Sequence, residues 1–146
     1  MCYAVYIGTI EKQETGKFIP SETTLYLENP TEDELKGLRP KFTKPNIYYV
    51  GSDTSCSCGF DFDSANINNP DWKDNLKSPA RLVDFLKEKS KHEDIEFYCC
   101  WEGDWHDDIE TRDEIEINDI SVDKNYFGLT EKQFIIFKGA GEKTSR

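Results

Sequence analysis

Residues 78–101 read SPARLVDFLKEKSKHEDIEFYCCW, and their hydrophobic period changes halfway along the stretch. Within residues 78–91, Leu82 and Leu86 are four residues apart, on one face of an amphipathic helix. Within residues 95–101, apolar and polar side chains alternate, as in a strand with one buried face. The stretch therefore predicts one clear helix followed directly by a strand, the pattern of a protein that mixes both element types.

Both predicted helices begin with a capping residue. Ser78 is a favourable N-cap, and Pro79 fits the first helical position because its missing N–H needs no partner there. A second, shorter helix is predicted over residues 31–38, with Thr31 as its N-cap and acidic residues in its first turn.

Five further segments have the β-branched and aromatic residues or the alternation typical of strands. They are residues 2–9, 23–27, 47–50, 114–120 and 133–137. These six short strands do not alternate regularly with helices, which argues against a doubly wound parallel sheet. We predict a single α+β domain over residues 1–138, built on a largely antiparallel sheet, with residues 139–146 as a frayed tail.

Residues 51–77 show no clear period. Glycine, proline, serine, aspartate and asparagine are frequent here, and the stretch is the longest irregular part of the chain. Loops of this length are usually functional or contain short structure of their own.

The charge of the chain is concentrated in one segment. The 146 residues include 18 lysines and arginines against 29 aspartates and glutamates, a net charge of −11. Residues 93–119 hold twelve of these carboxylates and a single basic residue, Arg112, so the rest of the chain is balanced. Such a balance argues against nucleic-acid binding, which depends on cations that displace counterions.

The leading functional hypothesis is a non-catalytic domain that docks a basic protein partner through an acidic surface at residues 93–119. An immunity or antitoxin-like protein and a regulatory adaptor both fit this composition. A purely solvated face and a site for a hard cation are the alternatives. If the strands at residues 95–101 and 114–120 pair, their carboxylates face one another at an energetic cost. The expected contact residues are Glu102, Asp104, Trp105, Asp107, Asp108 and Glu110.

Cysteine usage predicts a cytoplasmic protein. The count of five is odd, and Cys99 is adjacent to Cys100, whereas disulfide scaffolds usually have even counts in shorter chains. No apolar run approaches the roughly 20 residues that cross a bilayer, so no membrane span is expected. The apolar start of the chain, residues 1–10, is interpreted as a strand rather than a signal peptide.

A second hypothesis is a metal- or thiol-dependent protein. Cys56 and Cys58 would point to the same side of an extended segment, and thiolates with imidazole are the ligands that zinc prefers. No cofactor is expected under the leading hypothesis, whereas zinc is the possible cofactor under the metal version of this one. The candidate ligands are Cys56, Cys58, Cys99 and His106, with Cys2, Cys100 and His92 as further donors.

A third hypothesis is a small-ligand pocket between Trp101 and His106. Gly103 lies between Trp101 and Trp105, and a turn flanked by aromatic rings can line a pocket. The competing interpretation is simple packing, with Trp105 covering Trp101 at the end of a strand.

Overall fold

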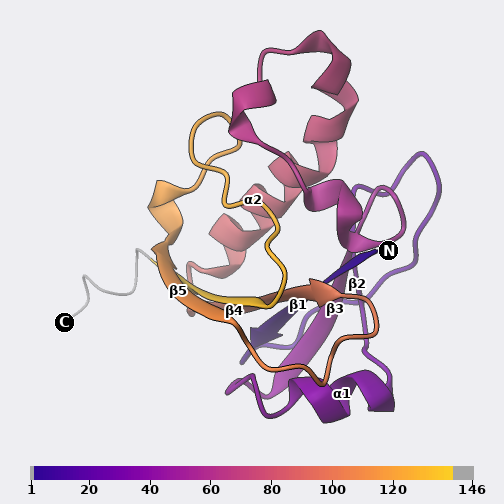
Figure 1. Ribbon diagram of the computed structural model, residues 1–146, viewed down its shortest axis with the longest axis vertical. Coiled ribbons are helices and arrows are strands. Elements are labelled where there is room, and N and C mark those ends of the chain that lie inside the picture. Colours follow the sequence, from indigo (N-terminus) through magenta and orange to yellow (C-terminus); the bar gives the residue numbers. More distant parts are fainter. Residues whose placement is uncertain (1, 140–146) are drawn as a thin grey trace.

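The computed structural model describes residues 2–139 and contains one six-stranded sheet with a helix on each face (Figure 1). The strand order is β2-β3-β1-β4-β6-β5. All neighbouring strands are antiparallel except β5 and β6, so the predicted α+β fold with a largely antiparallel sheet is confirmed. The strands are β1 (Tyr3–Thr9), β2 (Leu25–Glu28), β3 (Asn46–Ser52), β4 (Ile95–Trp101), β5 (Thr111–Glu116) and β6 (Gln133–Lys138).

Helix α1 (Glu32–Leu38) confirms the shorter of the two predicted helices. The Thr31 side chain accepts a hydrogen bond from the Glu34 backbone N–H, and the Glu34 side chain accepts one from the Thr31 N–H. This reciprocal capping box satisfies two N–H groups that the helix itself leaves without partners.

Helix α2 (Lys77–Lys89) confirms the longer helix, but its start differs from the prediction. The chain is already helical before residue 77, because the 3₁₀ helix η3 (Pro70–Leu76) runs directly into α2. Ser78 is therefore not the N-cap: its buried hydroxyl donates to the Thr24 carbonyl oxygen at 2.6 Å and accepts from the Asp53 N–H at 3.0 Å.

In the described part of the chain no helix has the length and apolar character of a membrane span.

The segment between β3 and α2 contains short structure that the sequence did not reveal. Besides η3, it forms two 3₁₀ helices, η1 (Ser57–Phe60) and η2 (Ser64–Asn66). Helices of three or four residues have no room for a hydrophobic period, so periodicity cannot identify them.

Each face of the sheet has its own core. Along β1, Val5 and Ile7 pack in the cluster that includes α2, whereas Ala4 and Tyr6 pack in the cluster that includes α1. All four are fully buried. Figure 1 shows α2 and α1 on opposite sides of the sheet.

The strands of the acidic segment, residues 93–119, do not pair in the way that the sequence suggested. The strand expected at residues 114–120 is β5, which ends at Glu116, and a 3₁₀ helix, η4 (Ile117–Asp119), follows it. Strand β6 separates β4 from β5, with Glu96 and Glu114 opposite Ile136 from its two sides. The two acidic strands therefore do not pair, and their carboxylates do not face one another.

Gly139 is buried, and its N–H donates to the Asp94 carboxylate at 2.8 Å. The other residues of the predicted tail, 140–146, lie outside the described residues.

Candidate metal centre

Three cysteines from two distant parts of the chain converge at one end of the sheet. Cys2 comes just before β1, whereas Cys56 and Cys58 lie at the start of η1. Their Sγ atoms all lie within 4.8 Å of one another, and the three residues are half-buried. All three thiols are free.

Ser57 fixes η1 against the sheet. Its fully buried hydroxyl accepts a hydrogen bond from the Val5 N–H at 2.9 Å and donates to the Val50 carbonyl oxygen at 2.6 Å. Val5 and Val50 are opposite one another in β1 and β3, so one side chain ties the cysteine segment to both strands. This tie brings Cys56 and Cys58 close to the beginning of β1.

Ser52 holds the turn that precedes η1. Its backbone N–H and its hydroxyl both donate to the Cys56 carbonyl oxygen, at 2.8 and 2.6 Å, and its hydroxyl accepts from the Gly59 N–H at 3.0 Å. Ser55 has a φ of 64°, a left-handed conformation that is uncommon outside glycine and that tightens this turn. The thiols thus converge through a turn and a 3₁₀ helix, not through the extended segment that the sequence suggested.

The three thiols have different electrostatic surroundings. Burial raises the pKa of the Cys58 thiol to about 11. The backbone N–H of Tyr3, which donates to the Cys58 sulfur at 3.2 Å, lowers this pKa but does not cancel the effect of burial. Burial alone would also raise the pKa of Cys56, but hydrogen bonds to its sulfur, including one from Thr54, lower it overall. The neighbouring Cys56 raises the pKa of Cys2. In the cluster Cys56 is thus the first thiol to ionise.

This geometry suits a thiolate-bound metal ion. Zinc binds thiolate sulfur at about 2.3 Å, so two sulfurs of a tetrahedral site lie about 3.8 Å apart. The three Sγ atoms of the cluster lie within 4.8 Å of one another, which is close to this spacing. No histidine, aspartate or glutamate of residues 2–139 joins the three cysteines, so the described part of the chain brings together three possible metal ligands.

The structure brings together only part of the predicted ligand set. Cys99 is buried in the core between the sheet and α2, outside the cluster of sulfurs. His106 is exposed, with its Nε2 atom 3.7 Å from an Asp33 carboxylate oxygen. Cys2, which the sequence offered only as a further donor, takes the third place. The pairing of β1 with β3 places the start of the chain next to η1. The spacing of the cysteines in the sequence does not show this pairing.

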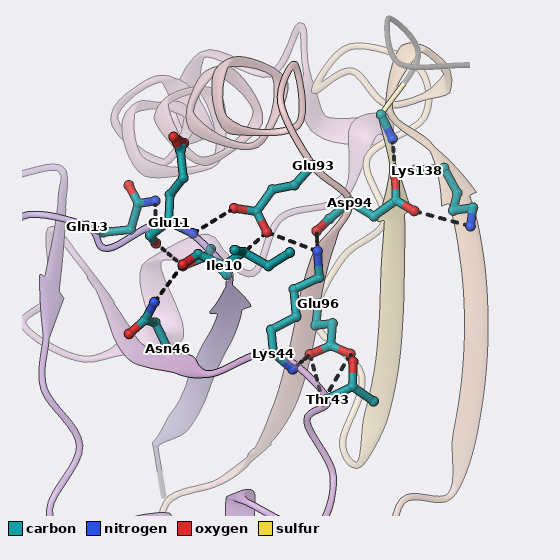
Figure 2. Close-up of polar contacts among 12 residues, drawn as sticks. Ile10, Glu11, Gln13, Thr43, Lys44, Asn46, Glu93, Asp94, Glu96 and Lys138 are labelled. Carbon is teal, nitrogen blue, oxygen red and sulfur yellow. Dashed lines mark hydrogen bonds and ion pairs between the residues drawn. The ribbon is translucent and has the colours of Figure 1, made fainter. Parts of the chain in front are cut away.

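Three carboxylates of the acidic segment make contacts within the fold (Figure 2). The Glu93 carboxylate is 2.9 Å from the Lys44 ammonium, and Asp94 is 3.2 Å from that of Lys138. Glu96 is 3% exposed and accepts hydrogen bonds from the backbone N–H groups of Thr43 and Lys44, and from the Thr43 hydroxyl.

The loop after β4, residues 102–110, has fewer basic partners for its carboxylates than Glu93 and Asp94 have. Lys132 lies 3.2 Å from Asp107 and 3.7 Å from Glu110, so these two carboxylates are partly neutralised. Among the described residues, Glu102, Asp104 and Asp108 form no ion pair.

The two tryptophans near this loop lie on opposite faces of the sheet. Trp101 stacks on Tyr3, with ring centroids 4.2 Å apart, and Tyr3 packs against the α2-side core. Trp105 packs against the α1-side core. The two rings therefore do not line one pocket.

No family model, curated protein or solved structure matches this chain.

Proposed function

We propose that this protein binds zinc through the thiolates of Cys2, Cys56 and Cys58. The observation that carries the proposal is the convergence of the three Sγ atoms within 4.8 Å. Soft thiolate ligands select zinc and cuprous copper over hard cations. Three thiolates and a divalent zinc ion together carry one net negative charge, whereas the same thiolates around cuprous copper would carry two.

The proposed site is open. Structural zinc sites use four protein ligands, whereas sites with three protein ligands keep a position for water or another molecule. Within residues 2–139 the fourth ligand does not come from the chain. The zinc ion is therefore proposed to hold an exchangeable ligand on the surface beside β1 and η1.

Metal analysis of protein purified under reducing conditions without chelator tests the proposal. We expect stoichiometric zinc in the unmodified chain and a large loss in each of the variants Cys2→Ser, Cys56→Ser and Cys58→Ser. Cys100→Ala is the matched control, because Cys100 is a buried cysteine outside the cluster. Protein without zinc, or full zinc in all three variants, would refute the site.

Cobalt gives a second measurement that does not depend on the metal acquired during expression. Cobalt(II) bound by thiolates in a tetrahedral site absorbs strongly in the near-ultraviolet and visible ranges. We expect these bands when the metal-free protein is titrated with cobalt, and their disappearance when zinc is added.

We propose docking of a basic protein as a second candidate function. It is supported by Glu102, Asp104 and Asp108, which have no ion-pair partner in the described chain. Acidic patches attract cationic partners by long-range steering that salt screens. Binding of a poly-lysine peptide should weaken strongly in the combined variant Asp104→Lys, Asp107→Lys and Asp108→Lys, and should weaken with added salt. Unchanged binding at low and high salt would contradict it.

A further inference from the structure

The α1 face of the sheet carries a hollow of about 360 Å³ between the start of α1 and the loop after β4. Strands β1, β2 and β3 form its floor, and Ser55 and Thr31 lie at its border. Four aromatic side chains line it: Tyr6, Tyr26, Tyr49 and Trp105. Three carboxylates line it as well: Glu28, Glu34 and Glu102.

The tyrosine rings are held in place by their neighbours. The Tyr49 ring meets the Tyr6 ring edge to face at 5.7 Å and the Tyr26 ring at 6.3 Å, each at an interplanar angle of 65°. Tyr26 lies across Gly51, where a Cβ atom would come within 2.1 Å of its ring. Its hydroxyl donates to the Ser55 carbonyl oxygen at 2.8 Å. The aromatic floor is thus formed before any ligand arrives.

The wall opposite α1 is fixed through the backbone of Trp105. The Lys41 ammonium donates to the carbonyl oxygens of both Gly37 and Trp105, each at 2.8 Å. The indole Nε1 of Trp105 is buried and has no hydrogen-bond partner in the described chain. Burial raises the pKa of the Tyr6 hydroxyl, and the nearby Trp105 ring opposes this shift. The ring is therefore held by its backbone and by packing rather than by its own polar atom.

The charge of the hollow has one sign. No lysine, arginine or histidine of the described chain lines it. Glu34 is engaged internally, because it accepts hydrogen bonds from the Thr31 N–H and the Tyr6 hydroxyl. Glu28 and Glu102 are exposed, and neither forms an ion pair in the described part of the chain. These two carboxylates attract a cation toward the rings.

Aromatic walls decide which cation fits. A hard metal ion takes oxygen ligands and keeps water, so a site lined by four aromatic rings does not supply the coordination that it prefers. An alkylated ammonium group is weakly hydrated, and it is held by the negative faces of aromatic rings. We propose that this hollow binds an alkylated ammonium group, with its methyl groups against the rings of Tyr26, Tyr49 and Trp105 and its charge balanced by Glu28 and Glu102. This proposal does not rest on the zinc site.

Calorimetric titration with choline and with a peptide that carries trimethyllysine tests the proposal. We expect binding of at least one of the two, and none of 3,3-dimethylbutanol, a neutral molecule of the same shape as choline. Binding of choline indicates a free small molecule as the natural source of the group, whereas binding of the peptide alone indicates a modified protein. Binding of neither probe, equal binding of the neutral molecule, or equal binding of the unmethylated lysine peptide would overturn it.

Two variants locate the binding. Trp105→Leu should weaken binding about tenfold, and Glu102→Gln should weaken it about threefold, in line with cation–π and surface charge energies. The matched controls are Trp72→Leu and Glu88→Gln, since both residues lie outside the hollow. Glu102 is exposed, so its variant tests the proposal even if loss of Trp105 affects folding. Unchanged affinity in both variants would place the ligand elsewhere. Retention of zinc by both would separate this result from the metal site.

Discussion

Glu93 shows how a residue of the acidic segment can stabilise the fold. Its carboxylate accepts hydrogen bonds from the backbone N–H groups of Ile10 and Glu11, at 2.7 and 3.0 Å, and from the Lys44 ammonium at 2.9 Å. The Glu93 side chain is only 9% exposed, and the Lys44 side chain 15%. Charged hydrogen bonds in such a shielded place are stronger than surface ion pairs, because water competes less for them.

We predict that Glu93→Gln lowers the free energy of unfolding by about 2 kcal/mol, because it leaves the Lys44 ammonium without its counter-charge. Urea denaturation at neutral pH measures the change. The control is Glu88→Gln, an exposed position on α2, which should change stability by less than about 0.5 kcal/mol. Equal effects of the two substitutions would show that the Lys44 pair contributes nothing.

The same contacts predict an acid-sensitive fold. Partial burial opposes ionisation of Glu93, but the two backbone donors and Lys44 outweigh it and lower the pKa of Glu93 below 4.5. The pKa of Asp94 likewise falls below 3.8, because contacts with Gly139 and Lys138 outweigh its burial. Each carboxylate therefore contributes stability above its unfolded pKa, and this is lost as the pH falls through the folded pKa. We expect a decline in unfolding free energy below about pH 4.5 that is shallower in Glu93→Gln.

The candidate metal site could be predicted only in part from single residues. The Cys56–Cys58 pair marked the site, because two thiols so close in sequence stay close in any local fold. The third ligand depends on Ser57, which ties η1 to β1 and β3. A serine hydroxyl that bridges two strands leaves no pattern in the sequence, so nothing favoured Cys2 over Cys99.

At the scale of elements, α1 and the loop after β4 approach each other closely at a small residue, Gly37. A Cβ atom on Gly37 would come within 2.3 Å of the Trp105 carbonyl oxygen. Lys41 donates to the carbonyl oxygens of both residues, which makes this contact the joint between helix and loop. The joint leaves no space for a methyl group, so the backbone of one element would have to move.

We predict that Gly37→Ala lowers the free energy of unfolding by about 1–3 kcal/mol, the usual cost of overpacking. It should also shift the fluorescence of the protein, since Trp105 loses its fixed backbone. Gly16→Ala is the matched control, because a Cβ atom there meets nothing within 4 Å. A Gly37→Ala protein as stable as the control, with unchanged fluorescence, would show that the joint tolerates the methyl group.

Strand existence was predictable from period and composition, but strand neighbours were not. The run QFIIF at residues 133–137 is apolar on both sides, which indicated a strand covered on both faces. Nothing local shows that β6 lies between β4 and β5, or that it runs parallel to β5. Those neighbours decide that Glu96 turns toward the backbone of Thr43 and Lys44 instead of facing Glu114.

At the scale of the whole molecule, concentration of charge in the sequence does not equal concentration on the surface. The basic residues that meet the acidic segment, Lys44, Lys132 and Lys138, come from before and after it in the chain. Counting charges in a window misses such partners. The negative character that remains lies on the loop after β4, at the border of the aromatic hollow and along β5, where Asp113 and Glu114 are exposed and form no ion pair in the described chain.

Zinc should act on the stability of the entire molecule, because its proposed ligands come from segments more than fifty residues apart in sequence. A metal that binds only the folded chain stabilises it by about 2.7 kcal/mol when free zinc is a hundredfold above the dissociation constant. We expect zinc to raise the melting temperature of metal-free protein, and a chelator to reverse the effect.

The thiols must lose protons to bind, and the pKa values of Cys2 and Cys58 are raised, so the stabilisation should shrink as the pH falls from 8 to 6. Differential scanning calorimetry of Cys58→Ser should show no response to zinc, while Cys100→Ala should respond like the unmodified protein. An equal rise in Cys58→Ser would mean that the metal stabilises the fold from somewhere other than the three converging sulfurs.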